Sequence, residues 1–189
     1  GYGNTAVGSE ALSISVDGDY NTAIGYRALQ DYENGDGNGH NTAVGADSQL
    51  NASTGEFNTS LGSYSMGSGV TTGDYNIAVG YQAGKVLTSG GYNHLIGGRA
   101  GDALTTGTSN IAIGYAALGG EDTGSKSIAI GEGALQVQNN DANNHNVAIG
   151  HHAGHLVSTG VENTIIGGNA GDALTIGNHN VAVGFEALS

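Results

Sequence analysis

The feature that most constrains this chain is a five-residue phrase that recurs from one end to the other. It consists of Asn, a variable residue, Ala, then Val or Ile, and Gly, as in residues 76–80. Copies start at positions 4, 21, 41, 58, 76, 93, 110, 127, 146, 163 and 180, so the basic spacing is 17 residues. A unit of this length cannot bury a core alone and must stack on its neighbours. The sequence therefore predicts one elongated repeat domain over residues 1–189.

Two positions of the phrase are almost constant. The first is Asn in all copies but one, and we expect these side chains to stack and to satisfy turn backbone groups rather than to bind a ligand. They are Asn4, Asn21, Asn41, Asn58, Asn76, Asn93, Asn110, Asn146, Asn163 and Asn180. The fifth position predicts a turn and is always glycine: Gly8, Gly25, Gly45, Gly62, Gly80, Gly97, Gly114, Gly131, Gly150, Gly167 and Gly184.

The spacing of apolar residues favours strands over helices. Apolar residues do not recur at helical spacing, and glycine every few residues opposes a helix. A second glycine, three residues before most copies, predicts a left-handed turn, because glycine tolerates positive φ. We expect two short strands and two turns per coil, the second strand anchored by Leu87, Leu104, Val157 and Leu174. The fold class is thus all-β, a parallel β-solenoid of about eleven 17-residue coils.

The two faces of the first strand carry different residues. Positions two and four of the phrase point to one side and position three to the other. We expect Val and Ile at positions two and four to fill the coil, and Ala at position three to meet other chains. The predicted inter-chain face consists of Ala6, Ala23, Ala43, Ala78, Ala112, Ala129, Ala148 and Ala182. Closed cyclic symmetry is the simplest way to bury such a face.

The phrase resembles the head repeats of trimeric autotransporter adhesins, which have units of the type Asn-Ser-Val-Ala-Ile-Gly. Residues 76–80 and 127–131 carry this likeness, and the longer forms at 21–29 and 80–84 resemble repeats of phage tail fibres. The resemblance implies left-handed coils and a homotrimer. The repeats here are longer than those of the adhesin heads. Since both ends of the sequence fall within repeats, we expect a fragment of a longer chain.

Composition and motifs exclude several classes of function. Lys and Arg total 4 against 17 Asp and Glu, a formal charge of −13, so the attraction that drives nucleic-acid binding is lacking. No apolar run is long enough to predict membrane insertion. The sequence carries no nucleophile elbow, no phosphate-binding loop and no paired carboxylates, and we therefore expect no enzyme.

One row of aromatic residues is a candidate glycan-binding stripe. Its members directly precede the phrase: Tyr20, His40, Phe57, Tyr75, Tyr92, His145 and His179. Aromatic rings in a row can stack on sugar rings, but they can equally cover the coil edge and stack on each other.

Two groups of residues carry donor atoms that suit metals. Asn34, Asp36 and Asn38 match the first half of a calcium loop, although its terminal Glu is missing and a plain Gly-Asn turn is the alternative. Calcium is therefore the one cofactor candidate. Imidazoles can ligate zinc or nickel, and four histidines lie close in sequence: His145, His151, His152 and His155. No carboxylate has an obvious spacing from them, so we predict surface histidines without a metal.

Together these features predict a structural and adhesive segment of an extracellular trimeric fibre, of the phage tail fibre type. It would support or form a surface that contacts a host glycan or protein. The alternatives are the head of a bacterial trimeric adhesin, a self-assembling cell-surface filament, and an ice-binding solenoid. The last would need a regular Thr row, and the row that starts at Thr5 ends after Thr59.

Overall fold

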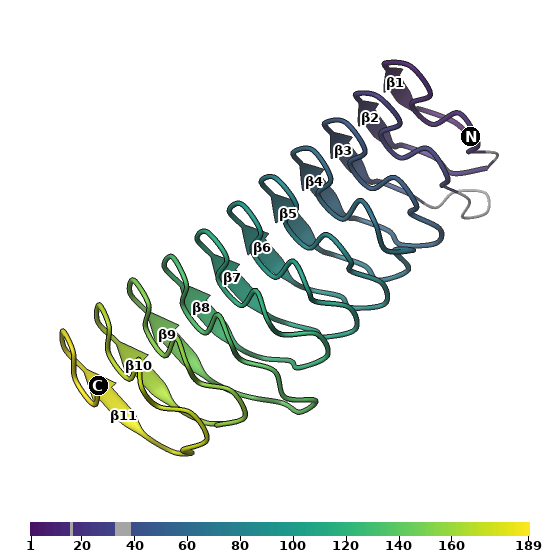
Figure 1. The fold of residues 1–189 in the computed structure, drawn as a ribbon. Helices are drawn as coiled ribbons and strands as arrows, with labels where there is room; N and C mark the ends of the chain where they lie inside the picture. Colours follow the sequence, from purple (N-terminus) through teal and green to yellow (C-terminus); the bar gives the residue numbers. More distant parts are fainter. Residues whose placement is uncertain (16, 33–38) are drawn as a thin grey trace.

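The computed structural model describes residues 1–15, 17–32 and 39–189, which wind into a rod with the termini at opposite ends (Figure 1). The described residues form eleven strands in one parallel sheet, paired in the order of the sequence. The confirmed fold is an all-β solenoid of about 10 turns with roughly 17 residues per coil. The strands are β1 Thr5–Val7, β2 Thr22–Ile24, β3 Thr42–Val44, β4 Thr59–Leu61, β5 Ile77–Val79, β6 His94–Ile96, β7 Ile111–Ile113, β8 Ile128–Ile130, β9 Val147–Ile149, β10 Thr164–Ile166 and β11 Val181–Val183.

The strands pair so that equal positions of the phrase lie opposite each other. Ala6 pairs with Ala23 at one end of the sheet, and Ile165 with Ala182 at the other. The spacing of 20 residues between the second and third copies does not disturb this register, because the extra residues fall between the strands. Residues at the same position of the repeat therefore form a continuous column along the rod.

The prediction of a second strand in each coil is wrong. Outside the eleven strands, the described residues form isolated bridges instead, such as Asp19 with Gly39 and Ala52 with Thr71. The chain turns directly after the fixed glycine, where alternate residues have positive φ, as at Gln82 (59°) and Gly84 (56°). These left-handed residues form the turn that precedes the segment of Leu87, and that segment itself is not a strand.

The prediction for the two strand faces is also wrong, because the Ala column lies inside its own coil. Its members from Ala23 to Ala148 are fully buried within a single chain, and Ala182 is 3% exposed. Ala6 belongs to the terminal coil and is exposed. The side chains at positions two and four point outward instead. The interior of a coil is narrow, and the opposite wall already supplies Leu87 and Leu104, so a methyl group fits where a larger side chain would not.

The two large exceptions in the Ala column confirm that this column is interior. Leu95 and Ile165 stand where most coils have Ala, and both are fully buried. A Cβ added at Gly84 or Gly101 would lie 2.8 or 2.9 Å from the side chain of Leu95. Gly154 and Gly171 lie against Ile165 in the same way. All four glycines stand four residues after the fixed glycine, and in four other coils that position holds a buried Leu or Met: Leu29, Met66, Leu118 and Leu135. A larger residue on one wall is thus matched by glycine on the other.

The fixed glycine of the phrase is required for two reasons. At Gly114 φ is +133°, and an added Cβ would lie 2.5 Å from the carbonyl oxygen of Gly131 in the next coil. The predicted left-handed turn at the other glycine column is wrong, since Gly73, Gly90 and Gly107 do not have positive φ. Glycine is needed there because a Cβ at Gly90 would lie 2.4 Å from the carbonyl oxygen of Gly107.

We predict that Gly114→Ala lowers the free energy of unfolding by roughly 1–3 kcal/mol, the usual range for a residue held in a forbidden backbone region. Gly98→Ala is the matched control, because its Cβ would come no closer than 3.4 Å to any atom and its backbone is not left-handed. Urea unfolding followed by circular dichroism measures both. Equal stability of the two variants would contradict the steric account of the fixed glycine.

Candidate functional site

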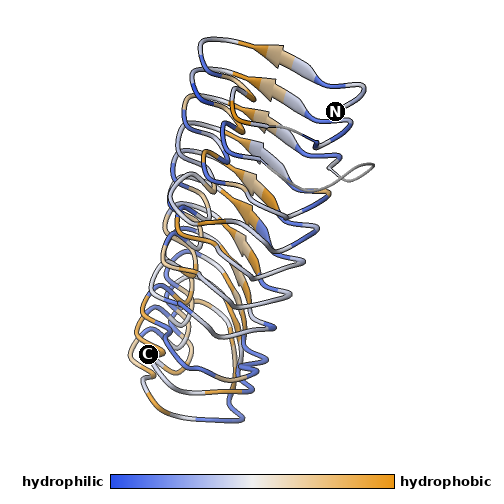
Figure 2. Cartoon of the chain, turned by 90° about the vertical axis from the view of Figure 1, so that its right-hand side faces the viewer, coloured by the Kyte–Doolittle hydropathy of each residue, from blue (hydrophilic) through white to orange (hydrophobic). Residues whose placement is uncertain are grey.

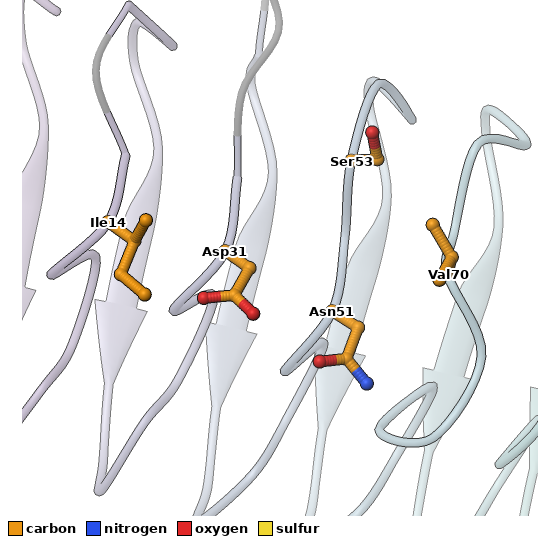
Figure 3. A pocket seen from close by; sticks show the side chains of 5 residues that line it. All are labelled: Ile14, Asp31, Asn51, Ser53 and Val70. Atoms are coloured by element: carbon orange, nitrogen blue, oxygen red, sulfur yellow. The ribbon is translucent and has the colours of Figure 1, made fainter.

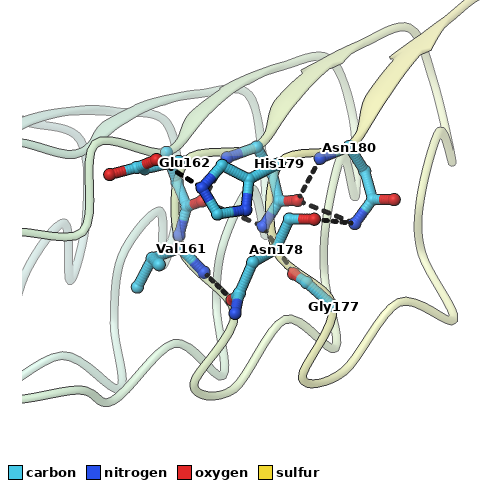
Figure 4. A network of polar contacts seen from close by, with 8 residues as sticks. Val161, Glu162, Gly177, Asn178, His179 and Asn180 are labelled. Carbon is cyan, nitrogen blue, oxygen red and sulfur yellow. Dashed lines mark hydrogen bonds and ion pairs between the residues drawn. The ribbon is translucent and has the colours of Figure 1, made fainter.

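The Asn column forms a buried ladder along the rod. The side-chain Oδ1 of Asn93 accepts a hydrogen bond of 3.0 Å from the backbone N–H of Asn110 in the next coil. The Nδ2 group of Asn93 donates to the carbonyl oxygen of Gly107 at 2.9 Å. Figure 4 shows the same pattern near the C-terminus, where the backbone N–H of Asn180 donates to Oδ1 of Asn163 at 2.9 Å. From Asn41 to Asn163 the asparagines of this column are buried and bond to backbone groups, so the arrangement serves the structure.

The ladder changes where the phrase has Ser127 instead of Asn. Ser127 is too short to reach the next coil, and the side chain of Gln138 fills the space. Its Nε2 donates to Ser127 Oγ at 2.8 Å, while its Oε1 accepts from Nδ2 of Asn146 at 2.7 Å. Gln138 also donates to the fully buried carboxylate of Glu121 at 2.9 Å, and Asn144 does the same at 2.9 Å. The substitution is thus compensated by a buried polar network.

The first five members of the aromatic row stack on one another. Ring centroids are 5.0 Å apart for Tyr20 and His40, 5.1 Å for His40 and Phe57, 4.9 Å for Phe57 and Tyr75, and 5.2 Å for Tyr75 and Tyr92. A sugar binds an aromatic ring through its flat face, and here those faces are covered by neighbouring rings. The stack supports the alternative interpretation of the row, as a cover for the coil edge.

The last two members of the aromatic row stand apart from this stack. Ser109 and Lys126 follow Tyr92 in the column, so neither His145 nor His179 continues the run of rings. The Nε2 atom of His179 lies 2.7 Å from a carboxylate oxygen of Glu162, one coil earlier (Figure 4). The predicted row is therefore one continuous stack and two separate histidines.

Three of the four clustered histidines lie together after β9. The rings of His151 and His152 stack with centroids 3.9 Å apart, and those of His152 and His155 are 4.7 Å apart. One ligand atom from each of Glu132, His151 and His152 lies within 4.8 Å of the others. His145 belongs to the aromatic column and not to this group.

Sequence reasoning missed Glu132, although the repeat contained the signal. Glu132 and His151 are both the first residue after the fixed glycine, in consecutive coils. Because Ile130 pairs with Ile149, the residues two positions later lie side by side. The separation of 19 residues between Glu132 and His151 corresponds to one coil.

His155 is held at the edge of the histidine group. Its Nε2 lies 2.9 Å from Oε1 of Gln136. Partial burial lowers the pKa of His155 below its usual value, and the neighbouring His152 adds to the lowering, while Asp172 opposes it. The pKa lowering favours the neutral imidazole.

An apolar strip runs along the outward face of the sheet and was not expected there. The fourth position of the phrase is aliphatic in every coil, and we call this column the aliphatic strip: Val7, Ile24, Val44, Leu61, Val79, Ile96, Ile113, Ile130, Ile149, Ile166 and Val183. The other outward strand position holds only Thr, Ile, Val and His94, so no strand of the described structure presents Lys, Arg, Asp or Glu. In Figure 2 the strands are mostly orange, for hydrophobic residues, and the turn before them is blue.

Two hollows are lined by residues that lie outside the strands. One has a volume of about 290 Å³ and is lined by residues of four consecutive coils, among them Ile14, Asp31 and Val70 (Figure 3). Another, of about 500 Å³, is lined by Arg99, Tyr115 and others, and its Arg99 binds Asp102 at 2.8 Å. The calcium candidates Asn34, Asp36 and Asn38 lie outside the described residues.

Comparisons of the chain with family models, with curated proteins and with solved structures found no match. The described part of the chain contains no helix with the length and apolar character needed to cross a membrane. Any function must therefore be inferred from the surfaces of the rod itself.

We predict that Asn93→Ala lowers the free energy of unfolding by roughly 2–4 kcal/mol, since it leaves a buried N–H and a buried carbonyl unpaired at about 1–3 kcal/mol each. The control Asn139→Ala removes an exposed amide of the same size and is expected to change stability little. Denaturant unfolding compares the two variants. A loss below about 0.5 kcal/mol in Asn93→Ala would show that the ladder is dispensable.

Proposed function

We propose that this chain is a structural segment of an extracellular fibre, in which three copies pack through the aliphatic strip. The observation that carries the proposal is the strip itself: eleven aliphatic side chains in one continuous column on a face without charged residues. Contiguous apolar surface on a soluble protein marks a site of association. The corrected orientation of the strand moves the proposed interface from the Ala column to this column.

The exposure of the strip in a single chain supports its burial against other copies. Val7, Leu61 and Ile149 are 56%, 47% and 37% exposed in the single chain. With a net charge of −13, separate chains repel one another through their remaining surfaces. A charge-free face is the surface on which like-charged chains can approach closely.

The strip alone is small for a stable pair of chains, and the proposed number of three comes from the resemblance to trimeric fibre repeats. Eleven strands at about 4.8 Å spacing and three residues at about 3.3 Å give a footprint on the order of 500 Å². A stable pair usually buries about 800 Å² on each partner. Around a three-fold axis each chain contacts two neighbours and also uses the flanks of its strip. One flank carries the exposed rings of Tyr81, Tyr115 and Phe185.

The sides of the rod that face away from the strip would then meet the host. They carry the variable positions of the repeat, and a host glycan or protein is the proposed receptor. The stacked aromatic row would stiffen this surface instead of stacking on sugars, because its ring faces are already occupied. A bacterial trimeric adhesin head or a cell-surface filament would use the same packing.

Light scattering coupled to size-exclusion chromatography tests the assembly. We expect a mass three times the 18.7 kDa of the chain. Replacing Ile96 and Ile130 with Asp together places charges in the strip and is expected to give monomers with an unchanged circular dichroism spectrum, because both side chains point out of the coil.

The matched control replaces Val137 and Leu156 with Asp. These two are also partly exposed aliphatic residues, at 43% and 42%, but they lie outside the strip. The control is expected to remain trimeric. A monodisperse monomer in the wild type, or equal dissociation of both double variants, would refute the proposed interface.

A further inference from the structure

We propose that Glu132, His151 and His152 form a zinc-binding site at the corner that follows β8 and β9. The three ligands come from two neighbouring coils of one chain, and Glu132 and His151 belong to the same column as Tyr81 and Tyr115, on the flank of the aliphatic strip. It has the donor types that zinc prefers: two imidazole nitrogens and a carboxylate oxygen.

The fold brings these ligands together through the register of the sheet. β8 and β9 pair at Ile130 and Ile149, and the fixed glycine follows each of them. The backbone N–H of His152 then donates to the carbonyl oxygen of Glu132 at 2.9 Å, which locks the two corners side by side. The backbone positions of all three ligands are therefore fixed before any metal arrives.

The distances suit a zinc ion. One donor atom of each residue lies within 4.8 Å of the other two. Zinc bonds of about 2.0–2.2 Å in tetrahedral geometry separate two ligand atoms by about 3.4 Å. Glu132 and His151 are exposed and His152 is partly exposed, so small side-chain rotations can close this difference. Three protein ligands would leave a fourth position for water.

Gly133 provides a second, independent observation. A Cβ at this position would lie 2.5 Å from Cδ2 of the His152 ring. The backbone conformation does not require glycine here, because the equivalent positions hold Arg27, Gln82 and Arg99 with similar positive φ. Glycine thus makes room for the His152 ring to lean over the preceding coil, toward Glu132.

The surroundings also favour a cation. The chain carries a net charge of −13, which draws cations to its surface. Hard cations such as Ca²⁺ and Mg²⁺ prefer oxygen ligands and fit a site with two imidazoles poorly. The site should therefore discriminate zinc from calcium.

Isothermal titration calorimetry of the whole chain with zinc chloride tests the proposal. We expect saturable binding of one zinc ion per chain, with no competition from an excess of calcium or magnesium. His152→Gln removes one of the three ligands and is expected to weaken zinc binding about tenfold or more, as loss of even an outer-shell partner costs about 10–100-fold.

Gly133→Ala provides a variant that keeps all three ligands. It is expected to weaken zinc binding because the added methyl group displaces the His152 ring, while circular dichroism remains that of the wild type. The matched control is His179→Gln, which removes a histidine that also contacts a carboxylate, Glu162, but has no second imidazole. This control is expected to bind zinc like the wild type.

The outcomes separate clearly. Absence of saturable binding at about 100 µM zinc, a concentration that fills any site of low-micromolar affinity, would overturn the proposal. So would a His152→Gln variant that binds zinc as tightly as the wild type, or equal weakening in His179→Gln. Weakening confined to His152→Gln and Gly133→Ala would support it.

Discussion

Backbone pairing between successive coils is the constraint on which the rest of this structure depends. Each strand is only three residues long, and no strand could persist without the ones before and after it. Because equal positions of the phrase pair, any residue type that recurs in the sequence becomes a continuous column on the rod. The Asn ladder, the aromatic stack and the aliphatic strip are all products of the same register.

The narrow interior then decides which columns are buried. Small residues suffice inside the coil, and the glycines opposite Leu95 and Ile165 show how strictly the volume is kept. Apart from Ile165, the β-branched aliphatic residues of the strands lie on the outer face, where a lone rod exposes them to water. Burial in this fold therefore follows size as well as hydrophobicity, and the face with more apolar area is the one that remains to be covered.

The repeat spacing was enough to predict the parallel solenoid and its coil length. It did not show which strand face is interior, because alternation separates two faces without ranking them. Position two offered a usable signal: Thr22 and His94 are polar there, whereas position three is Ala in most coils and Leu95 or Ile165 in others. A column that accepts His is an outward one. The expected second strand was inferred from leucine spacing, which identifies a buried wall but does not show whether the backbone of that wall forms a continuous ladder. Glu132 was missed because it was sought by distance in sequence from His151, and counting in coils places the two side by side.

We propose that other copies cover the aliphatic strip, whereas the Ala column faces its own coil. The sequence contains no cysteine, so single thiols at adjacent positions of β7 report on each face without interference. We predict that Ala112→Cys is inert to maleimide in the native protein, and that Ile113→Cys forms disulfide-linked dimers on oxidation at low protein concentration. A thiol at position 113 that maleimide labels freely and that never cross-links would contradict the account.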